Sequence, residues 1–300
     1  MSHHPFTEAT DLTVAGGPVR LYSCGPAHGP PVLLLHGAML DTARGTWMHL
    51  APELARHGYR VLAPDLPRHG GSRPWRGRLG PARLEQVLEE LLDAVGVTRT
   101  SVVGMSMGGG IALGQLLRRP ERYTAAVLAA PGGLGARRPW QLTTYLVQRT
   151  PGFLVWSSWL MARFPRLLRS STLAALPGGT DTPGVEALLE LAEEEARAKH
   201  RHREPALDDW QTLSYGPFSM RTDYLPELHR VQVPVLWLRG EEDTLVRRPE
   251  TDAAAAATPG SEYVTIARAG HVSMLDRPEV FARHVLDFLQ RRAAGASAHL

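Results

Sequence analysis

Ser106 stands in a Gly-Met-Ser-Met-Gly segment that spans residues 104–108. An apolar run precedes this segment, and a run of small residues typical of a buried helix follows it. The pattern predicts a sharp strand-to-helix turn, with glycine where the backbone leaves no room for a side chain. Such a turn places the serine oxygen beside the unpaired N–H groups of a helix start, which stabilise developing negative charge. We therefore predict that Ser106 is a nucleophile and that the Met107 N–H binds an oxyanion.

A serine hydroxyl needs a general base to become a nucleophile, and the base needs a carboxylate to orient it. His271 follows one apolar run and Asp243 follows another, so both are predicted at strand ends. Glu241 and Glu242 compete with Asp243 on chemistry alone, since any carboxylate can orient an imidazole. The predicted scheme gives His271 the role of base and one of these three carboxylates that of orienting acid, and it needs no metal or organic cofactor.

Two further motifs complete a recognisable set. An apolar run ends in a His-Gly-Ala segment at 36–38, and the loop 65–72 is similar to a DxxGxGxS motif with Arg68 in place of its first glycine. Together the motifs resemble the α/β-hydrolase family, in its serine-nucleophile branch with a helical cap, over nearly the whole chain. The resemblance implies that the Ala38 N–H is the second oxyanion donor, and it selects Asp243 as the acid. The order Ser, Asp, His is the order of that fold.

Other polar residues near these motifs are interpreted as structural. His36 and His69 are predicted to pack in loops, and Asp65 is predicted to fix a turn by accepting hydrogen bonds. The sole lysine, Lys199, lies in a charged predicted helix, which argues against a lysine-dependent hydroxynitrile lyase.

Apolar strands alternate with amphipathic helices along most of the chain. In the segment 84–95, apolar residues recur at three- and four-residue steps, and a second helix of this kind is predicted from Pro278. This alternation predicts an α/β fold with a mostly parallel central sheet and helices on both faces. Ligands of such sheets bind beyond the carboxyl ends of the strands, where Ser106, Asp243 and His271 are all predicted.

About 100 residues interrupt the alternation, which is too long for a plain connection. We predict a core formed by residues 1–133 and 226–300, with an inserted helical cap at 134–225. Within the cap, four apolar side chains are predicted to bind substrate: Trp140, Trp156, Trp159 and Met161. The stretch 152–161 between Arg149 and Arg163 could instead lie on a membrane surface.

Composition agrees with a globular enzyme. The chain has 300 residues, 43% of them hydrophobic, and its single cysteine, Cys24, excludes an internal disulfide. The net charge is +3, but no compact basic tract suggests nucleic-acid binding. The first six residues lack a signal-peptide pattern, and no apolar run is long enough to span a bilayer, so we expect a cytoplasmic protein without stable membrane insertion. The bias toward Ala, Gly, Pro and Arg suggests a bacterial source, and the oligomeric state stays open.

The predicted function is hydrolysis of a carboxylic ester, or of a thioester or lactone, in an apolar small molecule through an acyl-enzyme. A serine at the nucleophile position argues against epoxide hydrolases and haloalkane dehalogenases, which the resemblance implies would use aspartate. Hydrolysis of a carbon–carbon bond and acyl transfer need the same triad and stay open. A ligand sensor that retains the triad is an alternative of another class, and turnover separates it from an enzyme.

Overall fold

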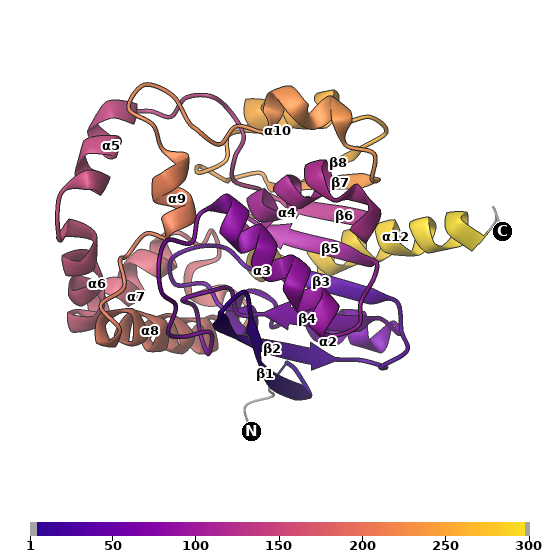
Figure 1. Cartoon of the computed structure of the whole chain (residues 1–300), viewed down its shortest axis with the longest axis horizontal. Coiled ribbons are helices and arrows are strands. Elements are labelled where there is room, and N and C mark those ends of the chain that lie inside the picture. Colours follow the sequence, from indigo (N-terminus) through magenta and orange to yellow (C-terminus); the bar gives the residue numbers. More distant parts are fainter. Residues whose placement is uncertain (1–4, 298–300) are drawn as a thin grey trace.

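The computed structural model describes residues 5–297, so part of the N-terminal segment used for the localisation prediction lies outside the described residues. Eight strands form one sheet, in the order β1-β2-β4-β3-β5-β6-β7-β8 (Figure 1). Strands β3 to β8 are parallel to one another. Strand β2 pairs antiparallel with β4 and so joins the hairpin to this parallel part of the sheet. The parallel strands are β3 (Pro31–Leu35), β4 (Arg60–Pro64), β5 (Thr100–Met105), β6 (Tyr123–Ala129), β7 (Val235–Gly240) and β8 (Glu262–Ile266).

The sheet begins with a hairpin that the sequence analysis did not foresee. Strand β1 (Glu8–Val14) pairs antiparallel with β2 (Gly17–Cys24). The two residues between them, Ala15 and Gly16, have φ angles of 48° and 73°. Positive φ at both positions matches the right-handed twist of the flanking strands, which closes the hairpin tightly.

Helices cover both faces of the sheet, as the alternation predicted. Two apolar cores lie on its opposite faces: side chains at alternate positions of β3 go to different cores, Leu33 and Leu35 to one and Val32 and Leu34 to the other. Helices α3 (Pro81–Ala94), α4 (Met107–Arg118) and α10 (Arg248–Ala257) contribute to the first core. Helices α1 (Ala43–Thr46), α2 (Leu50–Arg56), α11 (Ser273–Asp276) and α12 (Pro278–Ser297) contribute to the second. Because both faces are covered, the strands read as continuous apolar runs.

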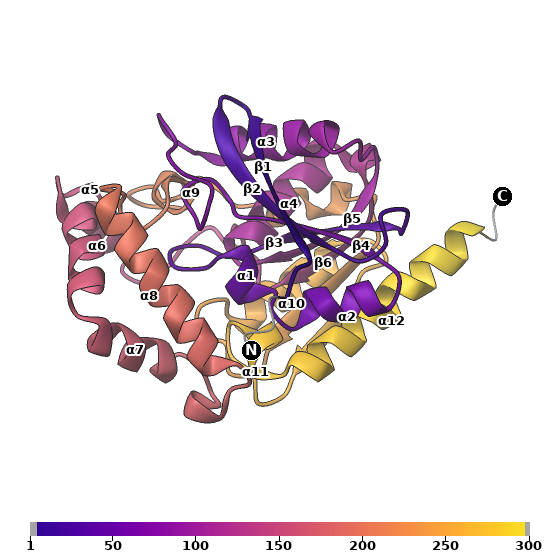
Figure 2. The ribbon, with the colours of Figure 1, turned by 90° about the horizontal axis from the view of Figure 1, so that it is seen from below.

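A long helical segment connects β6 to β7. It contains α5 (Gln141–Arg149), α6 (Phe153–Arg163), α7 (Pro165–Ala174), η2 (Gly179–Asp181), α8 (Val185–Arg201), α9 (Asp209–Ser214) and η3 (Leu225–Arg230). Figures 1 and 2 place α5 to α8 beside the sheet layers, at the end of the molecule opposite α12. Helix α8 contacts α1 of the core, and η3 packs back under α4 and α10. Within residues 5–297, none of the helices has an apolar stretch of the length that a bilayer crossing requires.

Candidate active site

Ser106 occupies the turn between β5 and α4, in a backbone conformation that few side chains adopt. Its φ and ψ angles are 50° and −115°, a strained combination that persists only where surrounding contacts enforce it. The Ser106 N–H donates to the Ala129 carbonyl at 3.0 Å, and the Ser106 carbonyl accepts from Gly110 and Gly132 at 2.9 and 2.8 Å. These contacts fix the turn from both sides.

The flanking glycines are required by close backbone contacts. A Cβ at Gly104 would lie 2.7 Å from the Cα of Gly109 in the same turn, and one at Gly108 would lie 2.3 Å from the carbonyl oxygen of Leu35. The start of α4 therefore rests directly on the end of β3. The same Cβ at Gly108 would lie 2.5 Å from the His36 carbonyl oxygen, so the start of α4 also meets the 36–38 segment that carries the other predicted oxyanion donor.

His36 fixes the orientation of that segment. Its Nε2 accepts the Leu66 N–H at 2.8 Å, so the ring proton is on Nδ1, which donates to the Gly37 carbonyl at 2.8 Å. The carbonyl and N–H of a trans peptide point in opposite directions, so this bond turns the Ala38 N–H away from His36. Burial and the neighbouring His69 hold the pKa of His36 well below its usual range, which keeps the ring neutral. The predicted packing role of this histidine therefore includes aligning the peptide that precedes Ala38.

Asp243 and His271 lie together at the ends of neighbouring strands β7 and β8. The His271 Nδ1 is 3.0 Å from the Asp243 Oδ2. The other oxygen, Oδ1, accepts the N–H groups of Leu245 and Val246 at 2.8 and 3.1 Å. Burial raises the pKa of Asp243, but the hydrogen bonds from His271 and these amides outweigh it, and the pKa lies below its ordinary value. The carboxylate is therefore ionised and oriented toward the imidazole.

The competing carboxylates face elsewhere. Glu241 and Glu242 are exposed, and the Glu241 carboxylate accepts the N–H of Arg268 at 3.4 Å. The loops of Asp243 and His271 also touch through their backbones, because a Cβ at Gly240 would lie 2.0 Å from the Gly270 carbonyl oxygen. The structure thus brings His271 to Asp243 rather than to either glutamate.

Asp41 is a site residue that the sequence analysis missed. Its Oδ2 lies 2.1 Å from the position that a Cβ at Gly37 would take, so the carboxyl packs against the segment before Ala38. Burial raises the pKa of Asp41 to about 6, while the nearby His271 and His69 act in the opposite direction. The only signal in the sequence was an acidic residue four positions after the His-Gly pair.

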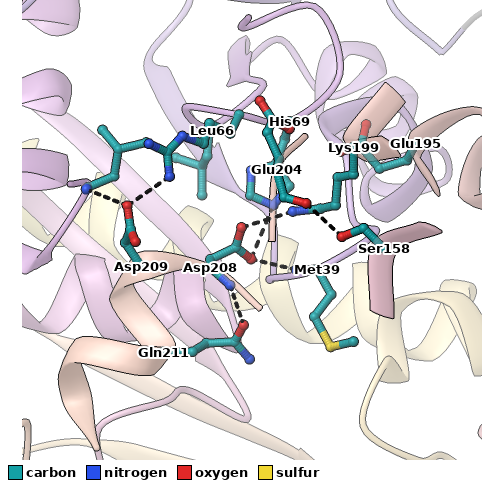
Figure 3. A network of polar contacts seen from close by, with 12 residues as sticks. Met39, Leu66, His69, Ser158, Glu195, Lys199, Glu204, Asp208, Asp209 and Gln211 are labelled. Atoms are coloured by element: carbon teal, nitrogen blue, oxygen red, sulfur yellow. Dashed lines mark hydrogen bonds and ion pairs between the residues drawn. The ribbon is translucent and has the colours of Figure 1, made fainter. Parts of the chain in front are cut away.

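A buried polar network joins the inserted helices to the same loop (Figure 3). Asp208 accepts the Met39 N–H at 2.7 Å and the Lys199 ammonium at 3.1 Å, and its Oδ2 lies 3.4 Å from the Nε2 of His69. Lys199 and His69 are each 1% exposed. Burial raises the pKa of Asp208, but the charges of Lys199 and His69 outweigh it and hold the pKa far below its ordinary value. Asp208 therefore ties α8 and α9 to the residue that follows Ala38.

In the loop 65–72, the structure confirms the predicted structural role of Asp65 and shows how Arg68 fits in place of the usual glycine. Asp65 accepts the Ala43 and Gly71 N–H groups at 2.9 and 2.8 Å, which is the predicted structural role. Arg68, in place of the usual glycine, takes a φ of 64°, the conformation that glycine would adopt with less strain. Its guanidinium binds the Asp209 carboxylate at 2.8 Å, so a contact to the inserted segment holds the loop in place.

The predicted substrate-binding residues differ widely in exposure. Trp140 is 82% exposed, Trp156 50% and Trp159 39%, whereas Met161 is half-buried. All three tryptophans are therefore substantially exposed to solvent. Their contact with substrate stays a prediction. No group of three or more potential metal-ligating side chains occurs in the part of the chain that the structure describes.

Comparison with known proteins identifies the family. A model of the alpha/beta hydrolase family matches residues 32–284. The carboxylesterase YbfK of Bacillus subtilis is 24% identical over 292 residues, which are 94% of this chain and 88% of that protein. A 2-hydroxy-6-oxo-6-(2'-aminophenyl)hexa-2,4-dienoic acid hydrolase of Metapseudomonas resinovorans is 28% identical over 273 residues, 88% of this chain and 86% of that protein.

A solved structure of similar length shares the fold. The thermophilic esterase from Thermogutta terrifontis has a TM-score of 0.75 at 21% identity, covering 95% of this chain and 99% of that one. With the family match over most of the chain, the eight-stranded sheet and the hydrolases among its relatives, this chain belongs to the alpha/beta hydrolase family.

Proposed function

We propose that the protein is a serine hydrolase that cleaves a carboxylic ester of an apolar small molecule through an acyl-enzyme. The observation that carries this proposal is the Asp243–His271 hydrogen bond at the sheet edge where the strained turn presents Ser106. Strain of this kind persists only where neighbouring contacts enforce it, and a turn of this type exposes the serine oxygen for attack.

In the proposed reaction His271 takes the proton of Ser106 as the serine oxygen attacks the ester carbonyl. Asp243 holds the proton of Nδ1, so Nε2 is free to accept. The Ser106 oxygen forms a bond to the carbonyl carbon, and the carbonyl oxygen becomes an oxyanion. His271 then gives its proton to the departing alcohol, which leaves the acyl group on Ser106. The same imidazole then deprotonates a water molecule, which attacks the acyl carbon. The bond to the Ser106 oxygen breaks, the imidazole returns the proton to that oxygen, and the acid is released.

The N–H groups of Ala38 and Met107 are the proposed oxyanion donors. His36 supports the first by orienting the Gly37 carbonyl, and Asp208 supports the next peptide by accepting the Met39 N–H. The position of Met107 at the start of α4 supports the second, because the first N–H groups of a helix have no partner within it. Losing one such donor costs roughly 3 to 4 kcal/mol of transition-state stabilisation.

Residues 134–225 are proposed as a helical cap over the site, with 1–133 and 226–300 as the core. The network around Asp208 supports this division, since it joins α8 and α9 to the loop beside the proposed oxyanion donors. Met161, half-buried on α6, and the three tryptophans are proposed to contact the apolar part of the substrate.

Ester hydrolysis is preferred because relatives over most of the chain include a carboxylesterase. A second candidate, hydrolysis of a carbon–carbon bond, is favoured by the relative that hydrolyses a substituted hexadienoic acid. Thioester or lactone cleavage, acyl transfer and a sensor role use the same site. We propose a cytoplasmic enzyme that acts on a small molecule, without organic cofactor, metal or nucleic-acid partner.

Turnover of p-nitrophenyl esters of graded acyl length, with thioesters, lactones and a dienoic diketone in parallel, tests the proposal. Wild-type protein should hydrolyse esters over many cycles and show a mass increase on the Ser106 peptide equal to the acyl group. Ser106→Ala and His271→Ala should each lose nearly all activity, and the double variant should be no worse, since triad members act as a unit. Glu242→Gln, at an exposed neighbouring carboxylate, is the matched control.

If Ser106→Ala kept most of the wild-type activity, the proposal of covalent catalysis by Ser106 would be overturned. Less than one turnover on every substrate class would favour the sensor, and a preference for the diketone would favour carbon–carbon hydrolysis.

A further inference from the structure

Exposed large apolar side chains gather in one stretch of the chain. Among the described residues, all of them apart from Phe218 and Leu245 lie between residues 140 and 167, on or beside α5, α6 and α7. The largest are Trp140, Leu146, Trp156, Trp159, Phe164 and Leu167. We call the exposed apolar side chains of residues 140–167 the outer apolar face. An apolar surface of this kind on a globular protein marks an interaction site.

The same stretch is strongly basic. Between residues 134 and 180 the sequence has no aspartate or glutamate, but it has arginines at 137, 138, 149, 163, 166 and 169. Arg138 and Arg169 are paired with acids from outside the stretch. The others, Arg137, Arg149, Arg163 and Arg166, are exposed and form no ion pair within residues 5–297. The outer apolar face is therefore bordered by unpaired positive charge.

A groove of about 250 Å³ lies at one border of this face, between α6 and α8. Trp159 and Ala162 form its apolar part. Its polar lining consists only of basic residues, Arg163, Arg197, His200 and Arg201. Arg197 also contacts Glu193 one turn earlier on α8, at 3.2 Å. A groove with an indole on one side and guanidinium groups on the other fits an anionic group attached to an apolar tail.

A second copy of the chain is a poor occupant. Symmetric dimers present the same patch on both subunits, so this face would bring unpaired arginines against unpaired arginines without an acid between them. Like charges placed together across an interface cost several kcal/mol. An anionic bilayer instead offers phosphate groups to the arginines and apolar depth to the aromatic rings. Tryptophan and arginine are suited to that boundary, because each combines an apolar body with a polar end.

We propose that the outer apolar face docks on the surface of an anionic phospholipid bilayer, and that the groove between α6 and α8 receives a lipid phosphate group. In this arrangement Phe164 and the solvent-exposed parts of Trp140 and Trp156 enter the headgroup layer, and Arg149, Arg163 and Arg166 contact phosphates around them. The docked end of the molecule is the one opposite α12, as Figure 2 shows. The proposal does not depend on the catalytic mechanism, since docking needs no turnover.

Vesicle flotation of the full chain tests this docking. The probes are vesicles of phosphatidylcholine alone and of phosphatidylcholine mixed with phosphatidylglycerol. The protein should float with the mixed vesicles and not with the neutral ones, and added salt should release it. Tryptophan fluorescence should shift to shorter wavelength on the mixed vesicles, because exposed rings leave water.

Two sets of variants separate charge from apolar contact. Arg149→Gln, Arg163→Gln and Arg166→Gln combined should weaken binding by about 100-fold, from about 1 kcal/mol for each basic residue near an anionic surface. Leu146→Ser and Leu167→Ser combined should weaken binding but leave the salt dependence of binding unchanged. Arg248→Gln is the matched control, since Arg248 is exposed on α10, away from the face. All these positions are exposed, so the variants should keep the wild-type melting temperature.

Three results would overturn the proposal. One is equal binding to neutral and mixed vesicles, or none to either. Another is a loss of binding free energy in Arg248→Gln as large as one third of the loss in the triple arginine variant, which would mean that net charge alone matters. The third is a dimer in light scattering that the Leu146→Ser and Leu167→Ser changes dissociate, which would assign the face to a second copy.

Discussion

One hydrogen bond fixes which nitrogen of His271 is available to the proposed nucleophile Ser106. Asp243 is fully buried at its side chain and accepts from Nδ1, so the acceptor lone pair is on Nε2. The two backbone N–H groups on its other oxygen prevent the carboxylate from rotating. The orientation of the proposed base is therefore fixed by the loop that follows β7.

Asp243→Asn should lower kcat by about three to four orders of magnitude, because an amide can donate to Nδ1 and stabilise the wrong tautomer. KM should change little, since the substrate does not contact Asp243. Steady-state kinetics on one short ester measures both constants. Glu241→Gln is the control and should retain wild-type kcat; the reverse pattern would move the acid to Glu241.

Asp41 should affect how kcat/KM depends on pH. Its carboxylate faces His271, His69, Asp208 and Glu195, and its pKa of about 6 is raised mainly by burial. Removing a negative charge beside His271 disfavours the imidazolium, so Asp41→Asn should move the acid limb of kcat/KM to lower pH. Asp41→Glu should restore the wild-type limb. An unchanged limb in Asp41→Asn would mean that this carboxyl does not act on the base.

The stability of the protein should also depend on pH through the carboxyl group of Asp41. Because the folded-state pKa of Asp41 is raised from 3.8 to about 6, the folded state binds this proton more tightly than the unfolded state. Wild-type stability due to this group is therefore greatest below pH 3.8 and is lost as pH rises through about 6. Asp41→Asn should remove that loss, so that thermal unfolding shows the variant gaining on the wild type toward neutral pH.

At the scale of elements, periodicity and turn residues were enough to predict the parallel sheet, the helix before Ser106 and the strand ends that carry Asp243 and His271. These features follow from local apolar patterns, which a single sequence displays. The hairpin of β1 and β2 was missed because β1 is mostly exposed and so has no apolar run. The apolar run at 152–161 was correctly taken as helical, and α6 spans Phe153–Arg163.

Helix α8 has a charged sequence but contains a buried lysine, which the sequence analysis did not predict. Sequence reasoning treats interspersed acids and bases as a solvated surface, yet Lys199 and Glu195 are 1% and 2% exposed. Their partners, Asp208 and Arg73, come from other segments, so no local pattern could reveal the pairs. The sequence analysis could not predict contacts between distant segments. In this protein such contacts surround the loop that carries the proposed oxyanion donor Ala38.

Asp208→Asn should therefore harm both folding and chemistry. It leaves the Lys199 ammonium buried without a carboxylate, which typically costs about 3 to 5 kcal/mol of stability. It also weakens the acceptor of the Met39 N–H, so kcat should fall further than KM rises. Lys199→Met combined with Asp208→Asn removes the unpaired charge and should recover stability but not kcat.

Chemical denaturation and steady-state kinetics of the single and double variants measure the two effects separately. Full recovery of kcat in the double variant would show that Asp208 supports the fold alone.

At the scale of the molecule, the proposed chemistry and the proposed recognition lie in different stretches of chain. The sheet edge carries Ser106, Asp243 and His271, whereas the segment between β6 and β7 carries the tryptophans and Met161. The two parts meet through Asp208 and Asp209, which contact the loops after β3 and β4. On this proposal, substrate choice varies with the helices while the proposed catalytic groups stay fixed on the sheet.

The acyl-length preference tests this division. Each methylene that fits an apolar pocket should contribute about 0.8 kcal/mol until the pocket is full. Trimming a side chain that lines the pocket should move the preferred length and raise KM for long esters more than it changes kcat for a short one. If burial governs contact with substrate, the shift should be largest for Met161→Ala, smaller for Trp159→Ala and Trp156→Ala, and smallest for Trp140→Ala, which is 82% exposed.

Leu146→Ala, at a side chain 57% exposed on the outer apolar face, is the control and should leave the length preference unchanged. Measuring kcat and KM across the ester series for these variants decides where each side chain acts. A tryptophan variant that keeps the wild-type length preference but loses binding to phosphatidylglycerol vesicles would belong to the outer face alone. An equal loss of activity on the shortest and longest esters would instead show that the side chain supports the packing of α5 and α6, because a pocket wall must discriminate between the two.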